Sequence, residues 1–309
     1  MMRFEEHCLR FDCAGELLVG ILSQPEHPRP IGLVIVVGGP QYRAGSHRQF
    51  ALLARRLASA GHAVLRFDCR GMGDSPGQIR SFLGISKDIA AAMGALQRAV
   101  PEVAAVALWG LCDGASASLI FLEDGPTCPL AGLCLLNPWV RSAQSLATAQ
   151  VKHYYTRRLR EPAFWRKLAR GQVGLGQIMA LAANLKAMFA GRPTAAGAQP
   201  SLTFQQRMAR AWMDSDCPIL LIISGRDLTA KEFTDSVVTD PAWRGALTRP
   251  QLQRLDLPMA DHTFSDDASR SAVEEATLAW LGSLPAWAVP GVSAPPRQAG
   301  VPIATQYGA

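Results

Sequence analysis

The chain has 309 residues, of which 49% are hydrophobic and 18% are charged, and its formal net charge is +6. This composition predicts a globular protein with one large core, and so small a surplus of basic residues does not indicate nucleic-acid binding. The first residues lack the apolar region of a signal peptide, and no segment reaches the roughly 18 uninterrupted apolar residues of a membrane span. We therefore expect a cytoplasmic protein with no transmembrane segment.

The seven cysteines are scattered along the chain, without a C-x-x-C pair or a histidine-rich partner segment. This pattern favours reduced thiols over a disulfide framework or a zinc site. No metal ion or organic cofactor is expected.

The first predicted element is an antiparallel hairpin over residues 5–26, where the sequence alternates in period two around a turn that contains Gly15. Helical patterns at 46–61 and 84–100 separate the apolar runs that come next. These runs, typical of strands, are 32–39, 62–71, 103–110, 130–137, 218–225 and, more weakly, 251–258. Strands buried on both faces and separated by helices indicate a mainly parallel, doubly wound sheet.

The alternation of strand-like apolar runs and helical patterns stops after residue 139, and residues 140–212 carry helical patterns instead. We interpret 140–212 as a helical cap, or lid, inserted between the sixth and seventh strands, with 1–139 and 213–284 as the two parts of the core. Residues 285–309 are rich in proline, glycine and alanine, which predicts a largely disordered tail.

The run 103–110 ends in the sequence Gly110-Leu111-Cys112-Asp113-Gly114, a G-x-C-x-G pattern followed by small residues. Such a pattern is typical of a nucleophile elbow, where a strand turns sharply into a helix and exposes one side chain. Because most elbows carry serine, two interpretations stay open. Cys112 is either the nucleophile or a small buried thiol at a structural turn.

Two further residues follow later strand-like runs. Asp227 comes after 218–225, and His262 comes after 251–258. Nucleophile, acid and histidine in this chain order match the triad of an α/β-hydrolase sheet. Asp227 alone could be a helix-capping residue, and Asp261 is the fallback for the acid.

The motifs together resemble the α/β-hydrolase superfamily over residues 10–284. A second hallmark is FDCRGMGDSPG at 67–77, whose Asp68 and Arg70 are predicted to brace neighbouring loops. With GGPQYRAGSHRQF at 38–50, the chain is most similar to the exosortase A system-associated hydrolase 1 family. That resemblance implies a bacterial protein encoded near machinery for exopolysaccharide production and protein sorting.

The resemblance implies a Cys-His-Asp triad, as in hydrolases similar to dienelactone hydrolase. A thiol at the amino end of a helix and beside a histidine is a competent nucleophile. His262 would act as general base or imidazolium partner, and Asp227 would orient it.

The expected oxyanion hole departs from the simplest template at Pro40, which has no N–H. The backbone N–H of Asp113 supplies one donor, and Gln41 or Gly39 supplies the other. Three basic residues beside this loop are candidates for binding an anionic substrate group: Arg43, His47 and Arg48. His47 could instead simply start the following helix.

Within the predicted cap, residues 152–170 contain seven Lys or Arg and interleaved aromatic residues. Three interpretations stay open: a solvated helix face, a peripheral membrane contact, and a cationic gate for an acidic substrate.

These features predict an enzyme that cleaves an ester or thioester through an acyl-thioenzyme intermediate, with a small-molecule or carbohydrate-linked acyl substrate and no nucleic-acid partner. One alternative is an acyltransferase in which a sugar hydroxyl replaces water. Another is a noncatalytic binding module that retained the fold, since fold alone does not imply function. The sequence does not set the oligomeric state.

Overall fold

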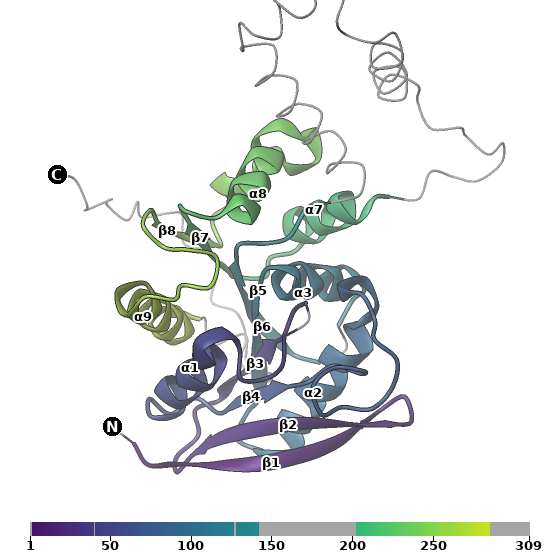
Figure 1. The fold of residues 1–309 in the computed structure, drawn as a ribbon, viewed down its shortest axis with the longest axis vertical. Coiled ribbons are helices and arrows are strands. Elements are labelled where there is room, and N and C mark those ends of the chain that lie inside the picture. Colours follow the sequence, from purple (N-terminus) through teal and green to yellow (C-terminus); the bar gives the residue numbers. More distant parts are fainter. Residues whose placement is uncertain (1, 40, 127, 142–201, 285–309) are drawn as a thin grey trace, which may run out of the picture. The chain divides into compact units, whose positions relative to one another are not determined.

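Figure 1 shows the computed structural model of the chain, which describes residues 2–39, 41–126, 128–141 and 202–284. Within these residues eight strands form one sheet in the order β1-β2-β4-β3-β5-β6-β7-β8. The strands are β1 (Phe4–Cys13), β2 (Glu16–Pro25), β3 (Ile31–Val36), β4 (Val64–Phe67), β5 (Ala105–Leu111), β6 (Leu130–Leu136), β7 (Ile219–Ser224) and β8 (Leu252–Leu257). Strand β2 pairs antiparallel with β1 and β4, and every other neighbouring pair is parallel. The predicted parallel sheet with an edge hairpin is confirmed.

Helices cover both faces of this sheet, which is why the central strands read as continuous apolar runs. The helices are α1 (Gln49–Ala58), α2 (Ser86–Ala99), α3 (Asp113–Glu123), α7 (Phe204–Asp214), α8 (Leu228–Thr239) and α9 (Asp267–Ser283), with short 3-10 turns η1 (Ser46–Arg48), η2 (Phe82–Gly84), η3 (Pro241–Trp243) and η4 (Ala246–Thr248). Helices α1 and α9 lie on one side of the sheet and α2 and α3 on the other (Figure 1). Every residue of β3, β5 and β7 is buried between them.

Large aromatic side chains fasten the helices to the sheet. Phe50 of α1 meets Trp109 of β5 edge to face, with ring centroids 5.5 Å apart. Trp280 of α9 lies so close over β6 that a Cβ added to Gly132 would be 2.7 Å from its ring. These contacts place the core between the helices and the sheet and fix the carboxyl ends of the strands.

Helix α7 belongs with the core, although the helical patterns place residues 204–212 in the cap. The described residues of 2–139 and 204–284 form one compact unit. Trp212 is fully buried against Phe233 and Trp243, and Arg207 pairs with Glu123 of α3 at 2.6 Å. An amphipathic helix can cover a core as well as a cap, so periodicity alone did not separate the two.

Residues 142–201 of the predicted cap, which include its basic segment 152–170, lie outside the described residues, as does the predicted tail 285–309. None of the helices that the structure describes combines the length and apolar character needed to span a membrane.

The turn at 67–77 braces two loops, as predicted. Asp68 is buried and accepts hydrogen bonds from the backbone N–H groups of Arg43, at 2.8 Å, and Asp74, at 3.0 Å. Arg70 is also buried and forms an ion pair of 2.7 Å with Asp88 in the first turn of α2. This pair ties the loop after β4 to the helix that follows it.

Replacing Asp88 with alanine should lower the free energy of unfolding by about 3 kcal/mol, because the Arg70 guanidinium would stay buried without its carboxylate. Asp267→Ala is the matched control: it also removes an ion-paired aspartate from the first turn of a helix, but the Asp267 side chain is 90% exposed. Urea unfolding should show a loss below about 1 kcal/mol for this control. Equal losses in the two variants would contradict a special role for the buried pair.

Candidate active site

Cys112 lies at the sharp turn between β5 and α3, in a backbone conformation that L-residues rarely adopt. Its φ is 60° and its ψ is −122°. The Cys112 N–H donates to the Leu136 carbonyl at 2.8 Å, and the Cys112 carbonyl accepts from Ala115 and Trp139 at 3.1 and 3.2 Å. Such strained backbone persists only where its surroundings fix it, as these bonds do.

The two glycines of the G-x-C-x-G pattern let α3 approach the sheet. A Cβ added to Gly110 would lie 2.5 Å from the carbonyl carbon of Gly114. A Cβ added to Gly114 would overlap the Val36 carbonyl of β3. The pattern therefore has a steric cause: only glycine permits this contact between β5, α3 and β3.

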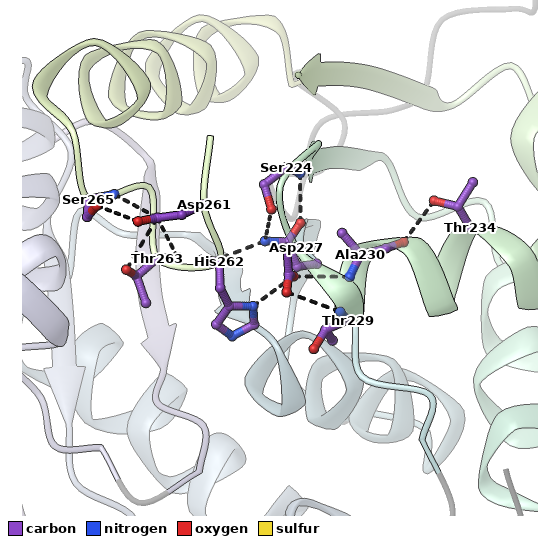
Figure 2. A network of polar contacts seen from close by, with 10 residues as sticks. Ser224, Asp227, Thr229, Ala230, Thr234, Asp261, His262, Thr263 and Ser265 are labelled. Carbon is purple, nitrogen blue, oxygen red and sulfur yellow. Dashed lines mark hydrogen bonds and ion pairs between the residues drawn. The ribbon is translucent and has the colours of Figure 1, made fainter. Parts of the chain in front are cut away.

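Asp227 follows β7 and does two things at once. It caps α8 by accepting the backbone N–H groups of Thr229, at 3.1 Å, and Ala230, at 3.0 Å, and it also accepts His262 Nδ1–H at 2.8 Å (Figure 2). Burial raises the pKa of Asp227, but these hydrogen bonds, led by the one with His262, outweigh burial and hold the pKa below its usual value. The Asp227 side chain therefore caps α8 and is also the hydrogen-bond partner of His262.

His262 lies on the loop between β8 and α9, with its ring between two functional partners. The hydrogen bond with Asp227, followed by one with the Cys112 side chain, raises the pKa of His262 to about 10. Cys112, His262 and Asp227 are therefore brought together from three different strand ends. Asp261 instead accepts hydrogen bonds from Thr263 and Ser265 within its own loop (Figure 2).

Asn137 was not predicted from the sequence, yet it ties this site together. It is fully buried at the end of β6, where its side-chain amide donates to Ser224 Oγ at 2.8 Å and to the His262 carbonyl at 3.3 Å. Its side-chain oxygen accepts the Ser224 N–H at 2.9 Å. The sequence did contain a signal for Asn137, since it is a polar residue directly after a buried apolar run. A residue in that position lies at the edge of the sheet where the carboxyl ends of the parallel strands meet.

The predicted oxyanion donors surround the Asp113 side chain. The Gly39 N–H donates to Asp113 Oδ2 at 2.7 Å, and the backbone N–H groups of Asp113 and Gly114 also act to lower the pKa of this carboxylate. Burial raises the pKa of Asp113 in spite of these bonds. Pro40 lies outside the described residues, and the Gln41 side-chain oxygen is buried without a hydrogen-bond partner.

The three basic candidates beside this loop differ in their surroundings. The Arg43 guanidinium pairs with Asp68 and, at 2.6 Å, with Asp74, so that its charge is already balanced by two carboxylates. His47 and Arg48 form the tight turn η1 with φ values of 52° and 62°. Arg43 is thus a brace in this structure, and its binding of an anionic substrate group stays a prediction.

A cavity of about 490 Å³ lies between this loop and the turn after β4. Its lining includes Gln41, Tyr42, Ser46, Met72 and Ile79. Tyr42 and Ile79 are exposed, at 50% and 78%. Apolar and polar groups therefore border the candidate oxyanion loop.

Within the part of the chain that the structure describes, no cluster of three or more His, Cys, Asp or Glu side chains could hold a metal ion.

Comparisons with known proteins agree with this architecture. The family described as serine aminopeptidase, S33, matches residues 28–236. An esterase from Pyrococcus furiosus has a TM-score of 0.59 at 16% identity, over 91% of this chain and 92% of that one. A dienelactone hydrolase from Anabaena variabilis scores 0.56 at 16% identity, over 91% and 98%. Est1E from Butyrivibrio proteoclasticus, with ferulic acid bound, scores 0.56 at 16% identity, over 89% and 98%. No curated protein matches the chain.

Replacing Asp227 with asparagine should move the pKa of His262 from about 10 toward its ordinary value of 6.5, because the leading cause of the shift is removed. The imidazole, protonated at pH 8 in the wild type, would then be largely neutral at that pH. NMR titration of labelled histidine, assigned by the signal missing in His262→Gln, measures both values.

Asp261→Asn is the matched control, since it neutralises the adjacent carboxylate without touching the bond to His262. Its titration should stay close to that of the wild type. A shift in Asp261→Asn as large as that in Asp227→Asn would contradict the assignment of Asp227 as the partner.

Proposed function

The chain belongs to the serine aminopeptidase S33 family of α/β-hydrolases, and we propose that it is an esterase-like acyl hydrolase whose nucleophile is Cys112. The observation that carries this proposal is the continuous contact from Asp227 to His262 to Cys112 at the elbow. The printed family description names serine enzymes, whereas the elbow of this chain has cysteine. We take the thiol as a replacement of the nucleophile within the same frame.

The reaction then has two acyl-transfer steps. The Cys112 sulfur attacks the substrate carbonyl carbon and forms a C–S bond, while the bond to the leaving group breaks and His262 supplies the proton to that group. Water next attacks the thioester and gives a proton to His262, and the C–S bond breaks. This releases the acid and restores the Cys112 sulfur as a thiolate beside the His262 imidazolium. Asp227 keeps the ring oriented throughout.

The charge of His262 suits both steps. Its pKa of about 10 in the resting site favours the imidazolium that protonates the leaving group. Acylation removes the hydrogen bond with the free Cys112 side chain, which is the second contribution to that raised pKa. The pKa of His262 therefore falls in the acyl-enzyme, which is the stage at which a neutral base must accept a proton from water.

An ester or thioester is the bond that fits this chemistry best. Expulsion of an alcohol or thiol needs less protonation of the leaving group than expulsion of an amine. The resemblance of residues 38–50, together with 65–75 and 108–116, to the exosortase A system-associated hydrolase 1 family supports a carbohydrate-linked acyl substrate. The mixed polar and apolar cavity beside that segment has room for such a group.

Incubation with short-chain p-nitrophenyl esters and acyl-CoA thioesters should give an acyl adduct of one acyl unit on the wild-type protein, detected by intact mass. Cys112→Ala should lose the adduct and lower kcat/KM by about 10³-fold or more, because the nucleophile is gone. Release of nitrophenolate or CoA gives the rate.

Cys8→Ala is the matched control, because Cys8 is an exposed free thiol that could react nonspecifically. It should keep both the adduct and the rate. Turnover that survives in Cys112→Ala, or no adduct across the whole panel, would contradict a cysteine nucleophile.

A further inference from the structure

The Asp113 carboxylate lies next to the backbone N–H groups that the proposed reaction needs as hydrogen-bond donors. In an elbow, the N–H of the residue after the nucleophile and an N–H from the loop after β3 stabilise the oxygen of the tetrahedral intermediate. Here the N–H of Asp113 is the candidate for the first donor, and Gly39 is one of the two candidates for the second. The Gly39 N–H donates to the Asp113 carboxylate at 2.7 Å, and the Asp113 N–H helps to lower the pKa of that carboxylate.

The backbone is shaped to admit this side chain. A Cβ added to Gly38 would overlap Asp113 Oδ1, so any other residue at position 38 would displace the carboxylate. Gly39 itself has φ of 56°, a conformation that favours glycine, and its N–H donates to Asp113 Oδ2. Two consecutive glycines thus form a place into which the carboxylate fits.

A carboxylate in this position resembles the species that the hole is built to bind. It is a negatively charged oxygen that accepts backbone N–H groups at the amino end of α3, as the tetrahedral oxyanion would. His262 also acts on this carboxylate electrostatically, which places Asp113 within the same site. The substrate oxygen and the carboxylate cannot both take the Gly39 N–H.

We propose that the Asp113 carboxylate occupies the oxyanion hole of the resting enzyme and competes there with the carbonyl oxygen of the substrate. This inference rests on the proposed function and deepens it. Asp113 then controls specificity, because an acyl group reacts only if its binding displaces the carboxylate from Gly39. The displaced carboxylate, partly buried, favours substrates that offer it a hydrogen-bond donor such as a hydroxyl.

Two reactions of Cys112 separate the hole from the nucleophile. Acylation by p-nitrophenyl acetate passes through an oxyanion, whereas alkylation by iodoacetamide is a displacement at a saturated carbon and forms none. The ratio of the acylation rate constant to the alkylation rate constant at Cys112 therefore reports on the oxyanion hole. The alkylation rate constant corrects for any change in the reactivity of the thiol. Both are measured by mass on the full chain.

Asp113→Ala should raise this ratio about tenfold, the effect of freeing one charge-assisted hydrogen bond. Asp113→Asn keeps a side-chain oxygen that can accept the Gly39 N–H without the charge, so its ratio should rise by less, about threefold. The asparagine variant also carries the test if the alanine variant does not fold. A ratio that rises in the order Asp, Asn, Ala supports competition for the hole.

An unchanged or lower ratio in both variants, with wild-type acylation intact, would overturn the inference and leave the proposed function standing. In that case Asp113 would only anchor the loop after β3, and its replacement would lower the melting temperature alone. If Cys112 alkylates in every variant but acylates in none, including the wild type, the proposed function fails and this inference fails with it.

Discussion

The close contact of β5, α3 and β3 at the Cys112 turn is the constraint on which the rest of the site depends. Gly110 and Gly114 remove the side chains that would keep the helix away from the sheet, and the turn then holds Cys112 at φ of 60°. This places the thiol at the amino end of α3 and, because α3 starts immediately after it, places the Asp113 N–H beside the thiol. One steric arrangement thus sets the positions of both the Cys112 thiol and the Asp113 N–H.

The position of His262 in the site depends on two polar residues that join strand ends. Asp227 links the start of α8 to His262, so a change in the cap of α8 also moves the imidazole. Asn137 joins the ends of β6 and β7 to the backbone of the His262 loop. The position of His262 is therefore fixed through both its ring and its carbonyl, which limits the motion of the ring toward or away from Cys112.

Much of the fold could be predicted because burial on both faces leaves a direct mark on the sequence, as in β3, β5 and β7. Cys112, Asp227 and His262, which meet at the site, could also be picked out, since each follows shortly after an apolar run. The contacts of Arg43 could not be predicted, because its partners, Asp68 and Asp74, are distant in sequence and meet it only in the folded chain. The position of the Asp113 carboxylate depends on the space above Gly38, which no linear pattern records.

Under the proposed function, Cys112 and the aspartate that follows it have linked electrostatic consequences. The tetrahedral oxyanion of the proposed reaction would add a third negative charge to the carboxylates of Asp113 and Asp227 around the His262 ring. Hydrogen bonds from the backbone to Asp113 and Asp227 offset part of this excess negative charge. When the substrate oxygen takes the Gly39 N–H in the proposed step, the Asp113 carboxylate loses that hydrogen bond while the negative charge moves from sulfur to the substrate oxygen. The total negative charge therefore does not change at that step, and moving the Asp113 carboxylate away from the hole separates it from the developing oxyanion.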